Sequence, residues 1–267
     1  MLLNPDAGRD LAKEAAAMDP AATWAAAGDA ALPGRGTLRR VALAGRALLL
    51  KREARGGFAA PVLPDRYLSS STFRREWALT LWLGERGLTP APAARWLVRR
   101  GRLYEVYTLL EPLPGVRSLA ERLAEGICGP EAMTAAGECV GRLHGLGVCH
   151  ADLNAGNLLL GADGRAWAID FRHSTRAPVL GEGRRIANLR RLERSLVKLS
   201  AHAPSPPSRE AWRALAAGYA RGFGRQETAV DRWADRAGSG FLLRKLGWAA
   251  REKIRRETRG SGGASSG

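Results

Sequence analysis

In the first half of the chain, apolar residues recur in short runs whose composition and spacing are typical of β-strands. Ala44-Gly45 is a turn signal between the first two of these runs. Ser71 and Thr72 are candidate caps for a helix over residues 73–86. The pattern predicts a small antiparallel sheet with one helix, and its strands are expected at residues 38–43, 47–52, 94–98 and 103–110.

The second half of the chain is mainly helical in pattern. Helices are expected over residues 130–146, 182–199, 208–221 and 232–257, and two short strands over 157–160 and 166–169. This indicates an α+β chain. We expect four parts: an Ala-rich leader (1–32), a sheet lobe (33–112), a helical lobe (113–257) and a flexible tail (258–267).

Composition adds a prediction about partners. Hydrophobic residues make up 45% of the 267 residues, which is ample for a core, and the formal net charge is +16. Such a charge favours an anionic partner: nucleic acid, an acidic membrane surface or a phosphorylated substrate. Abundant Ala, Gly and Arg leave open that coding bias supplies part of it. Because no base-stacking pattern of aromatic residues accompanies the charge, nucleic acid is not expected.

Several features that the sequence lacks indicate the cellular compartment of the protein. The three cysteines have no paired spacing, so a disulfide framework or zinc site is not expected and a reducing compartment is favoured. We find no secretory signal pattern and no apolar run that approaches the roughly 20 residues of a spanning helix. We expect a protein that is soluble or peripheral, on the cytoplasmic side.

A polar turn precedes the short strand at 157–160, in the stretch GVCHADLNAGNLLL. Asp152 and Asn157 lie in it, and Asp170 closes the following strand, so three oxygen-bearing side chains are expected at one edge. Asn157 and Asp170 suit Mg²⁺, which takes hard oxygen ligands. Asp152 suits the acceptance of a hydroxyl proton. The alternative is that Asp152 and Asn154 merely satisfy turn amides.

Phosphate chemistry also requires cations and a backbone cradle. Lys51 ends an apolar strand, from which its ammonium would reach phosphates, and Arg52 is an alternative. Glu76 lies on the inward stripe of its helix, where an acid needs a partner; Lys51 is expected, and a surface pair with an Arg is the alternative. Gly34 and Gly36 would let backbone amides approach phosphate.

These residues occur in the chain order of the protein-kinase signature set. The stretches HADLNAGNLLL, IDFRHSTR, LPGVRSLAERL and ANLRRLERSLVKL are similar to the 3-deoxy-D-manno-octulosonate (Kdo) kinase family, among the lipopolysaccharide kinases of Gram-negative bacteria. The similarity covers roughly residues 34–219.

The resemblance implies a protein-kinase-like fold of two lobes and ATP-dependent phosphorylation of the 4-hydroxyl of Kdo on a lipid A precursor. The protein would work as a monomer at the anionic inner face of the inner membrane. By resemblance, Asp152 is the catalytic aspartate, Asn157 and Asp170 are Mg²⁺ ligands, and Lys51 is the phosphate lysine with Glu76 as its partner. Nucleotide contacts would come from Gly34, Gly36, Lys51, Glu111 and Leu113.

Departures from the protein-kinase pattern qualify this expectation. Arg172 replaces the glycine of Asp-Phe-Gly, and Ala151 replaces the arginine of His-Arg-Asp. Regulation by loop phosphorylation is therefore not expected, and the short RHSTRAP stretch favours a non-peptide acceptor. His150 is expected to orient the loop through a backbone hydrogen bond, and His144 to pack at a helix end.

Two basic amphipathic segments, 184–199 and 241–257, allow two interpretations: they bind an anionic lipid surface, or they pack on the body of the protein with their charges in solvent. In the first, Leu189, Leu192, Leu196 and Leu199 form one stripe and Arg184, Arg185, Arg190, Arg191 and Arg194 lie largely elsewhere. Two functional alternatives also stay open: a kinase for another acceptor (lipopolysaccharide heptose, a small molecule or a protein), and a membrane-associated pseudokinase.

Overall fold

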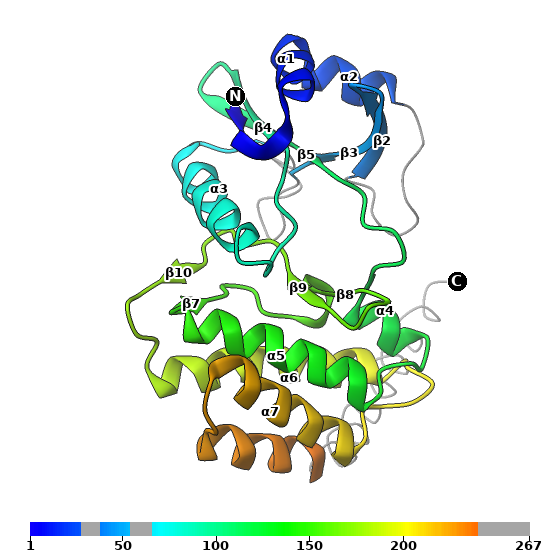
Figure 1. Cartoon of the computed structure of the whole chain (residues 1–267), viewed down its shortest axis with the longest axis vertical. Helices are drawn as coiled ribbons and strands as arrows, with labels where there is room; N and C mark the ends of the chain where they lie inside the picture. Colours follow the sequence, from blue (N-terminus) through cyan, green and yellow to red (C-terminus); the bar gives the residue numbers. More distant parts are fainter. Residues whose placement is uncertain (28–37, 54–65, 240–267) are drawn as a thin grey trace, which may run out of the picture. The chain divides into compact units, whose positions relative to one another are not determined.

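The computed structural model describes residues 1–27, 38–53 and 66–239. The chain divides into two compact units, Met1–Pro114 and Gly115–Gly267. The sequence predicts this division after Pro112, close to where it is found. Each unit is described by itself below, with the labels of Figure 1.

The first unit is built on a five-stranded antiparallel sheet. Along the chain its strands are β1 (Leu2–Leu3), β2 (Leu38–Leu43), β3 (Arg46–Arg52), β4 (Ala94–Arg100) and β5 (Leu103–Leu110), and they lie side by side in the order β1-β4-β5-β3-β2. Ala44 and Gly45 join β2 to β3 and both have positive φ, which suits the twist of a two-residue hairpin. The predicted sheet is confirmed.

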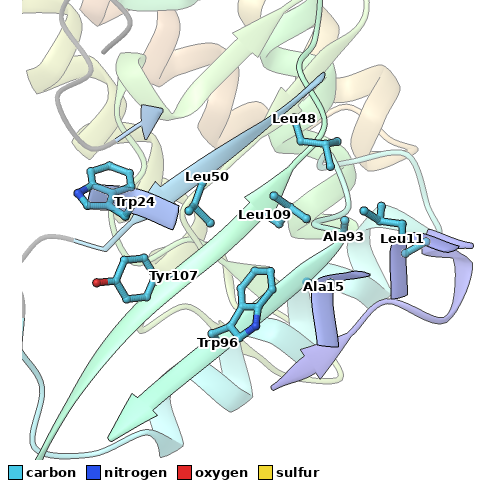
Figure 2. Packing of buried hydrophobic residues seen from close by; sticks show 11 residues of the cluster. Leu11, Ala15, Trp24, Leu48, Leu50, Ala93, Trp96, Tyr107 and Leu109 are labelled. Carbon is cyan, nitrogen blue, oxygen red and sulfur yellow. The ribbon is translucent and has the colours of Figure 1, made fainter. Parts of the chain in front are cut away.

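One face of the sheet is covered by α1 (Arg9–Ala17) and α2 (Pro20–Ala26), which follow a short 3₁₀ turn, η1 (Pro5–Ala7). Leu11 and Ala15 of α1 and Trp24 of α2 are buried against side chains of the sheet, including Leu50 and Leu109 (Figure 2). β1 also pairs with β4. Residues 1–26 therefore belong to the first unit, which corrects the prediction of a separate leader.

The opposite face of the sheet carries α3 (Ser71–Gly84). Phe73 of α3 is buried with Tyr67 and Val106, and Leu97 packs against them. The helix begins at Ser71, a residue that the sequence suggests as a cap before it. Because Leu97 and Val106 are paired neighbours on β4 and β5, α3 lies over the middle of the sheet.

The second unit is mainly helical. It contains α4 (Leu119–Ala124), α5 (Pro130–Gly145), α6 (Glu182–Ser200) and α7 (Arg209–Phe223), and residues 228–239 are also helical. Two small sheets accompany them: β6 (Arg117–Ser118) with β8 (Leu158–Leu160) and β9 (Ala166–Ala168), and β7 (Val148–Cys149) with β10 (Thr175–Arg176). A 3₁₀ turn, η2 (Ala155–Asn157), precedes β8.

The helices of this unit begin at recognisable signals. Pro130 is the first residue of α5, and Ser118 forms a capping box with Glu121 at the start of α4. Together, the antiparallel sheet unit and the helical unit confirm the α+β class, and they are compatible with the protein-kinase-like fold that the resemblance implies.

The burial of the leucines in α6 distinguishes between the two interpretations of this stripe. Leu189, Leu192 and Leu196 are fully buried, so the stripe packs on the body of the second unit, and only Leu199 is exposed. Arg185 is also buried, where it pairs with Glu227, contrary to the expectation that it lies on the polar face. The exposed face is still basic, through Arg184, Arg190, Arg191 and Arg194. The segment 241–257 lies outside the described residues.

Candidate active site

His150 fixes the polar turn between β7 and β8. The backbone N–H of Asp152 donates to His150 Nδ1 at 3.1 Å, and His150 Nε2 lies 2.9 Å from the carbonyl of Ile169. Because Nδ1 accepts, the ring proton belongs on Nε2, which donates to that carbonyl. Burial lowers the pKa of His150, which favours this neutral form. The predicted orienting role is confirmed.

The two asparagines of the turn have distinct roles. Asn154 Oδ1 accepts from the backbone N–H groups of Gly156 and Asn157, and its Nδ2 donates to Asp152 Oδ2 at 2.9 Å. Asn157 Nδ2 donates to the backbone carbonyl of Asp152 at 2.9 Å. Asn154 therefore satisfies the turn amides and also holds the side chain of Asp152. Asp152 itself is exposed.

Asp170 is brought beside Asn157 by the β8–β9 hairpin. Leu158 pairs with Ala168, and the N–H of Ile169 donates to the carbonyl of Asn157 at 3.0 Å. Asp170 follows Ile169, so its backbone lies next to that of Asn157. Asp170 has φ 64°, in the left-handed region that a residue with a side chain seldom adopts. Strained backbone of this kind clusters at functional sites. The turn and the hairpin thus bring the predicted Asp152, Asn157 and Asp170 to one edge.

Asn157 and Asp170 are oxygen donors that would suit a Mg²⁺ ion bound together with phosphate. The amide nitrogen of Asn157 is turned to the Asp152 carbonyl, which leaves its oxygen directed elsewhere. Within the described part of the chain no group of three or more His, Cys, Asp or Glu side chains forms a metal cage. Mg²⁺ is usually held by one or two carboxylates with waters and substrate phosphates, which this donor set matches.

α6 holds the turn at two points that the sequence analysis missed. Asn188 Nδ2 donates to the His150 carbonyl at 2.7 Å, and Ser195 Oγ accepts from the N–H of Ala155 at 3.1 Å. The sequence carries a signal for Asn188, because this polar residue lies directly beside Leu189 of the apolar stripe. In the structure Asn188 is only 4% exposed. A buried amide needs partners, and one of the partners of Asn188 lies in the turn.

Behind Asn188 the hydrogen bonds continue into the core of the unit. His144 Nε2 lies 3.1 Å from Asn188 Oδ1, and His144 Nδ1 lies 3.0 Å from the hydroxyl of Tyr219. Burial lowers the pKa of His144 to about 4 and raises that of Tyr219. His144 therefore packs near the end of α5, as predicted, and as a neutral ring.

The segment that follows Phe171 is tied to the same turn. Ser174 Oγ accepts from the N–H of Ala151 at 3.0 Å, Thr175 pairs with Cys149, and the N–H of Ala177 donates to the carbonyl of Gly147 at 3.0 Å. Phe171 itself is buried, with its ring 4.9 Å from that of His150. These contacts hold residues 174–177 against the turn.

In the first unit, Glu76 and Lys51 each have a buried partner. Glu76 Oε2 lies 3.0 Å from Arg95 Nη1, and Lys51 Nζ lies 3.0 Å from Glu53 Oε2. The sequence pattern predicts neither Glu53 nor Arg95 as a partner. Glu53 could have been found, because it follows Lys51 by two residues and so shares its strand face. Arg95 could not, since nothing nearby in the sequence marks an arginine in an apolar strand as the partner of Glu76.

The remaining predicted nucleotide contacts are placed as follows. Gly34 and Gly36 lie outside the described residues. Glu111, directly after β5, is exposed and pairs with Arg46, and Leu113 is half-buried in the segment that leads to the second unit. Arg52 pairs with Tyr107, so it lies on the sheet face covered by α1 and α2, opposite to Lys51.

Comparison with known proteins agrees with this chemistry. The model of the "Lipopolysaccharide kinase (Kdo/WaaP) family" matches residues 23–219. A 3-deoxy-D-manno-octulosonic acid kinase of Stenotrophomonas maltophilia (strain K279a) is 41% identical over 160 residues, which is 57% of this chain and 63% of that protein. The protein of the same name from Xanthomonas axonopodis pv. citri (strain 306) is 42% identical over 158 residues, 57% of this chain and 62% of its own length.

The chain thus spans less than two thirds of the length of these relatives. The family match, in contrast, covers most of the chain and includes both Lys51 of β3 and the whole turn from His150 to Asn157. This protein belongs to the lipopolysaccharide kinase (Kdo/WaaP) family.

Proposed function

We propose that this protein is an ATP-dependent kinase that phosphorylates a hydroxyl of Kdo on a lipid A precursor. The observation that carries the proposal is the arrangement of Asp152, Asn157 and Asp170 around one turn and one hairpin. The family and the printed name of the relatives support the same reaction. For the acceptor atom we propose the 4-hydroxyl.

The roles proposed for the side chains combine this geometry with the resemblance to the kinase family. Asp152 accepts the proton of the acceptor hydroxyl, whose oxygen attacks the γ-phosphorus of ATP while the bond to the ADP oxygen breaks. Asn157 and Asp170 would hold Mg²⁺, which supplies charge neutralisation at the phosphates. Lys51 would bind the phosphates, and Gly34, Gly36, Glu111 and Leu113 would contact the nucleotide.

Basic residues beside the turn support an anionic acceptor. Arg176 pairs with Val148 of β7, and Arg184 Nη2 donates to Thr175 Oγ1 at 2.9 Å. Both arginines are exposed, and Val179 between them is 81% exposed. A carboxylated sugar attached to a phosphorylated lipid presents the negative charges and apolar surface that such a segment would meet.

We further propose a peripheral position on the cytoplasmic face of the inner membrane, with the protein acting as a monomer. The exposed basic face of α6 would meet anionic headgroups. None of the helices in the described ranges combines the length and the hydropathy needed to cross a bilayer. Attraction of this kind weakens as salt is added, so vesicle binding should fall at high ionic strength.

The test is a transfer assay on the purified full chain with ATP and Mg²⁺. Kdo-bearing lipid A precursor, a heptose-bearing acceptor and an aminoglycoside are offered in parallel, and the position of the new phosphate is found by mass spectrometry. Transfer to Kdo alone is expected. Transfer only to another acceptor would move the proposal to that acceptor, and absence of transfer with retained ATP binding would favour a pseudokinase.

Two exposed aspartates of the second unit make a matched pair for this assay. Asp152→Ala should lower turnover by at least about a hundredfold while ATP binding persists, since general-base groups contribute that much. Asp163→Ala, in the turn between β8 and β9, removes the same charge and should leave turnover unchanged. Near-normal turnover of Asp152→Ala would reject its catalytic role.

A further inference from the structure

We propose that Arg95 is a positioning residue: it connects Glu76 of α3 to Lys51 of β3 through Glu53, and so sets where the lysine ammonium lies. The inference rests on the proposed function, in which Lys51 binds the phosphates of ATP. It concerns only the first unit, where all four side chains lie.

The register of the sheet places these residues together. Lys51 of β3 and Arg95 of β4 both pair with Thr108 of β5, so the three residues form a row across three strands. Directly paired residues point to the same face, and Glu53, two residues after Lys51, shares that face. It is the face covered by α3, because Leu97 and Val106, which pack with Phe73, have the same parity along their strands.

Arg95 is the centre of the contacts. Its Nη1 donates to Glu76 Oε2 at 3.0 Å and to the carbonyl of Phe73 at 3.1 Å, and its Nε donates to Thr108 Oγ1 at 3.0 Å. Its Nη2 lies 3.9 Å from Glu53 Oε1. One planar guanidinium therefore holds both the backbone and the acid of α3, together with two side chains of the sheet.

Glu53 passes this constraint to Lys51. One carboxylate oxygen, Oε1, faces Arg95 and lies 3.5 Å from the hydroxyl of Thr108, while the other, Oε2, lies 3.0 Å from Lys51 Nζ. Because the two oxygens belong to one rigid carboxylate, the orientation that Arg95 imposes on the first also places the second.

Burial and charge make the arrangement stiff. The side chains of Arg95, Glu53 and Glu76 are 4%, 5% and 6% exposed, whereas that of Lys51 is 27% exposed. The charges alternate from Glu76 to Arg95, Glu53 and Lys51, so each buried charge has an opposite neighbour. The ammonium at the accessible end is the member that can meet a ligand, and the buried members fix its place.

A double-mutant cycle tests whether Arg95 acts through Lys51. Binding of the non-hydrolysable ATP analogue AMP-PNP with Mg²⁺ is measured by calorimetry on the full chain and on the variants Arg95→Met, Lys51→Met and the double variant. Arg95→Met should raise Kd about tenfold when Lys51 is present, and by less than about twofold when Lys51 is already methionine. Arg95→Lys should recover only part of the loss, because an ammonium lacks the fork of donors.

The matched control is Arg99→Met, which removes the same charge from the exposed end of β4 and should leave Kd unchanged. An Arg95→Met protein that binds as wild type, or that loses affinity equally in both backgrounds, would overturn the inference while leaving the proposed function intact. Wild-type affinity in Lys51→Met would instead overturn the phosphate role of Lys51, and the inference with it. If Arg95→Met does not fold, Glu53→Gln takes its place in the same cycle, with the same two outcomes.

Discussion

Asn188 of α6 donates a hydrogen bond of 2.7 Å to the carbonyl of His150, two residues before Asp152, while its Oδ1 faces His144. We predict that Asn188→Leu, which keeps the size but loses both bonds, lowers the free energy of unfolding by about 2–4 kcal/mol, since two buried polar groups are left unpaired. Turnover should fall by at least about tenfold, with less change in KM for ATP, because a displaced base affects the transition state.

The comparison is with Ala187→Leu, which introduces the same side chain at an exposed position of the same helix and should change neither quantity. Urea unfolding gives the stability of both variants and a steady-state assay gives kcat and KM. Normal turnover by a folded Asn188→Leu protein would show that α6 does not position the turn.

Asn157 gives a prediction about metal dependence. Asn157→Ala removes the proposed oxygen ligand, so the Mg²⁺ concentration for half-maximal turnover should rise by at least about tenfold, the scale of one lost interaction with a charged group. Asn157→Asp keeps an oxygen at this position but loses the donor to the Asp152 carbonyl, and it should show a smaller shift in Mg²⁺ dependence with a lowered kcat. Titration of Mg²⁺ at saturating ATP measures both. An unchanged Mg²⁺ dependence of the alanine variant would remove Asn157 from the proposed metal site.

The parts of the fold and site that the sequence predicts are those encoded locally. The β2–β3 hairpin is marked by alternation and by Ala44-Gly45. The turn from His150 to Asn157 carries its own capping and orienting side chains within eight residues, so its shape follows from the local sequence.

What the sequence misses depends on partners that are distant along the chain. The Asn188 bond to His150 joins residues 38 apart, and the Arg95 bond to Glu76 joins residues 19 apart, so no periodicity relates the partners. The Ala-rich N-terminal segment carries only a weak apolar stripe, so its sequence does not show that it packs on the sheet. Leu11 and Trp24 are buried by sheet residues that lie far from them along the chain.

Close packing of α5 on α7 predicts which glycines are required. A Cβ added at Gly137 would lie 2.1 Å from the carbonyl oxygen of Leu215, and one at Gly218 would lie 2.1 Å from that of Thr134. Gly137→Ala or Gly218→Ala should therefore lower the free energy of unfolding by at least about 2 kcal/mol, because backbone must shift to admit the methyl group. Thermal and urea unfolding check this.

Gly183 in the first turn of α6 is the control, since no atom lies within 4 Å of an added Cβ. Gly183→Ala should be neutral or stabilise the protein by up to about 1 kcal/mol, through helix propensity alone. Equal effects at Gly137 and Gly183 would mean that the helix contact is not the cause.

His144 predicts how stability depends on pH. Its pKa is lowered from 6.5 to about 4 by burial, so between these values the unfolded chain binds a proton that the folded chain does not. The free energy of unfolding is therefore highest, as far as His144 is concerned, above pH 6.5. It falls as the pH is lowered, by about 3 kcal/mol at pH 4. Burial of His150 acts in the same direction.

His144→Gln removes this titration while keeping a side chain that can donate to Asn188. Its free energy of unfolding should be lower than that of the wild type at pH 7.5, and should decline less steeply between pH 6.5 and pH 4, as measured by urea unfolding at four pH values. Gly137→Ala, which destabilises the same helix without removing a titratable group, should lower the whole curve and leave its slope unchanged. If His144→Gln and Gly137→Ala show the same slope, the buried imidazole is not the source of the acid sensitivity, because only one of the two variants has lost it.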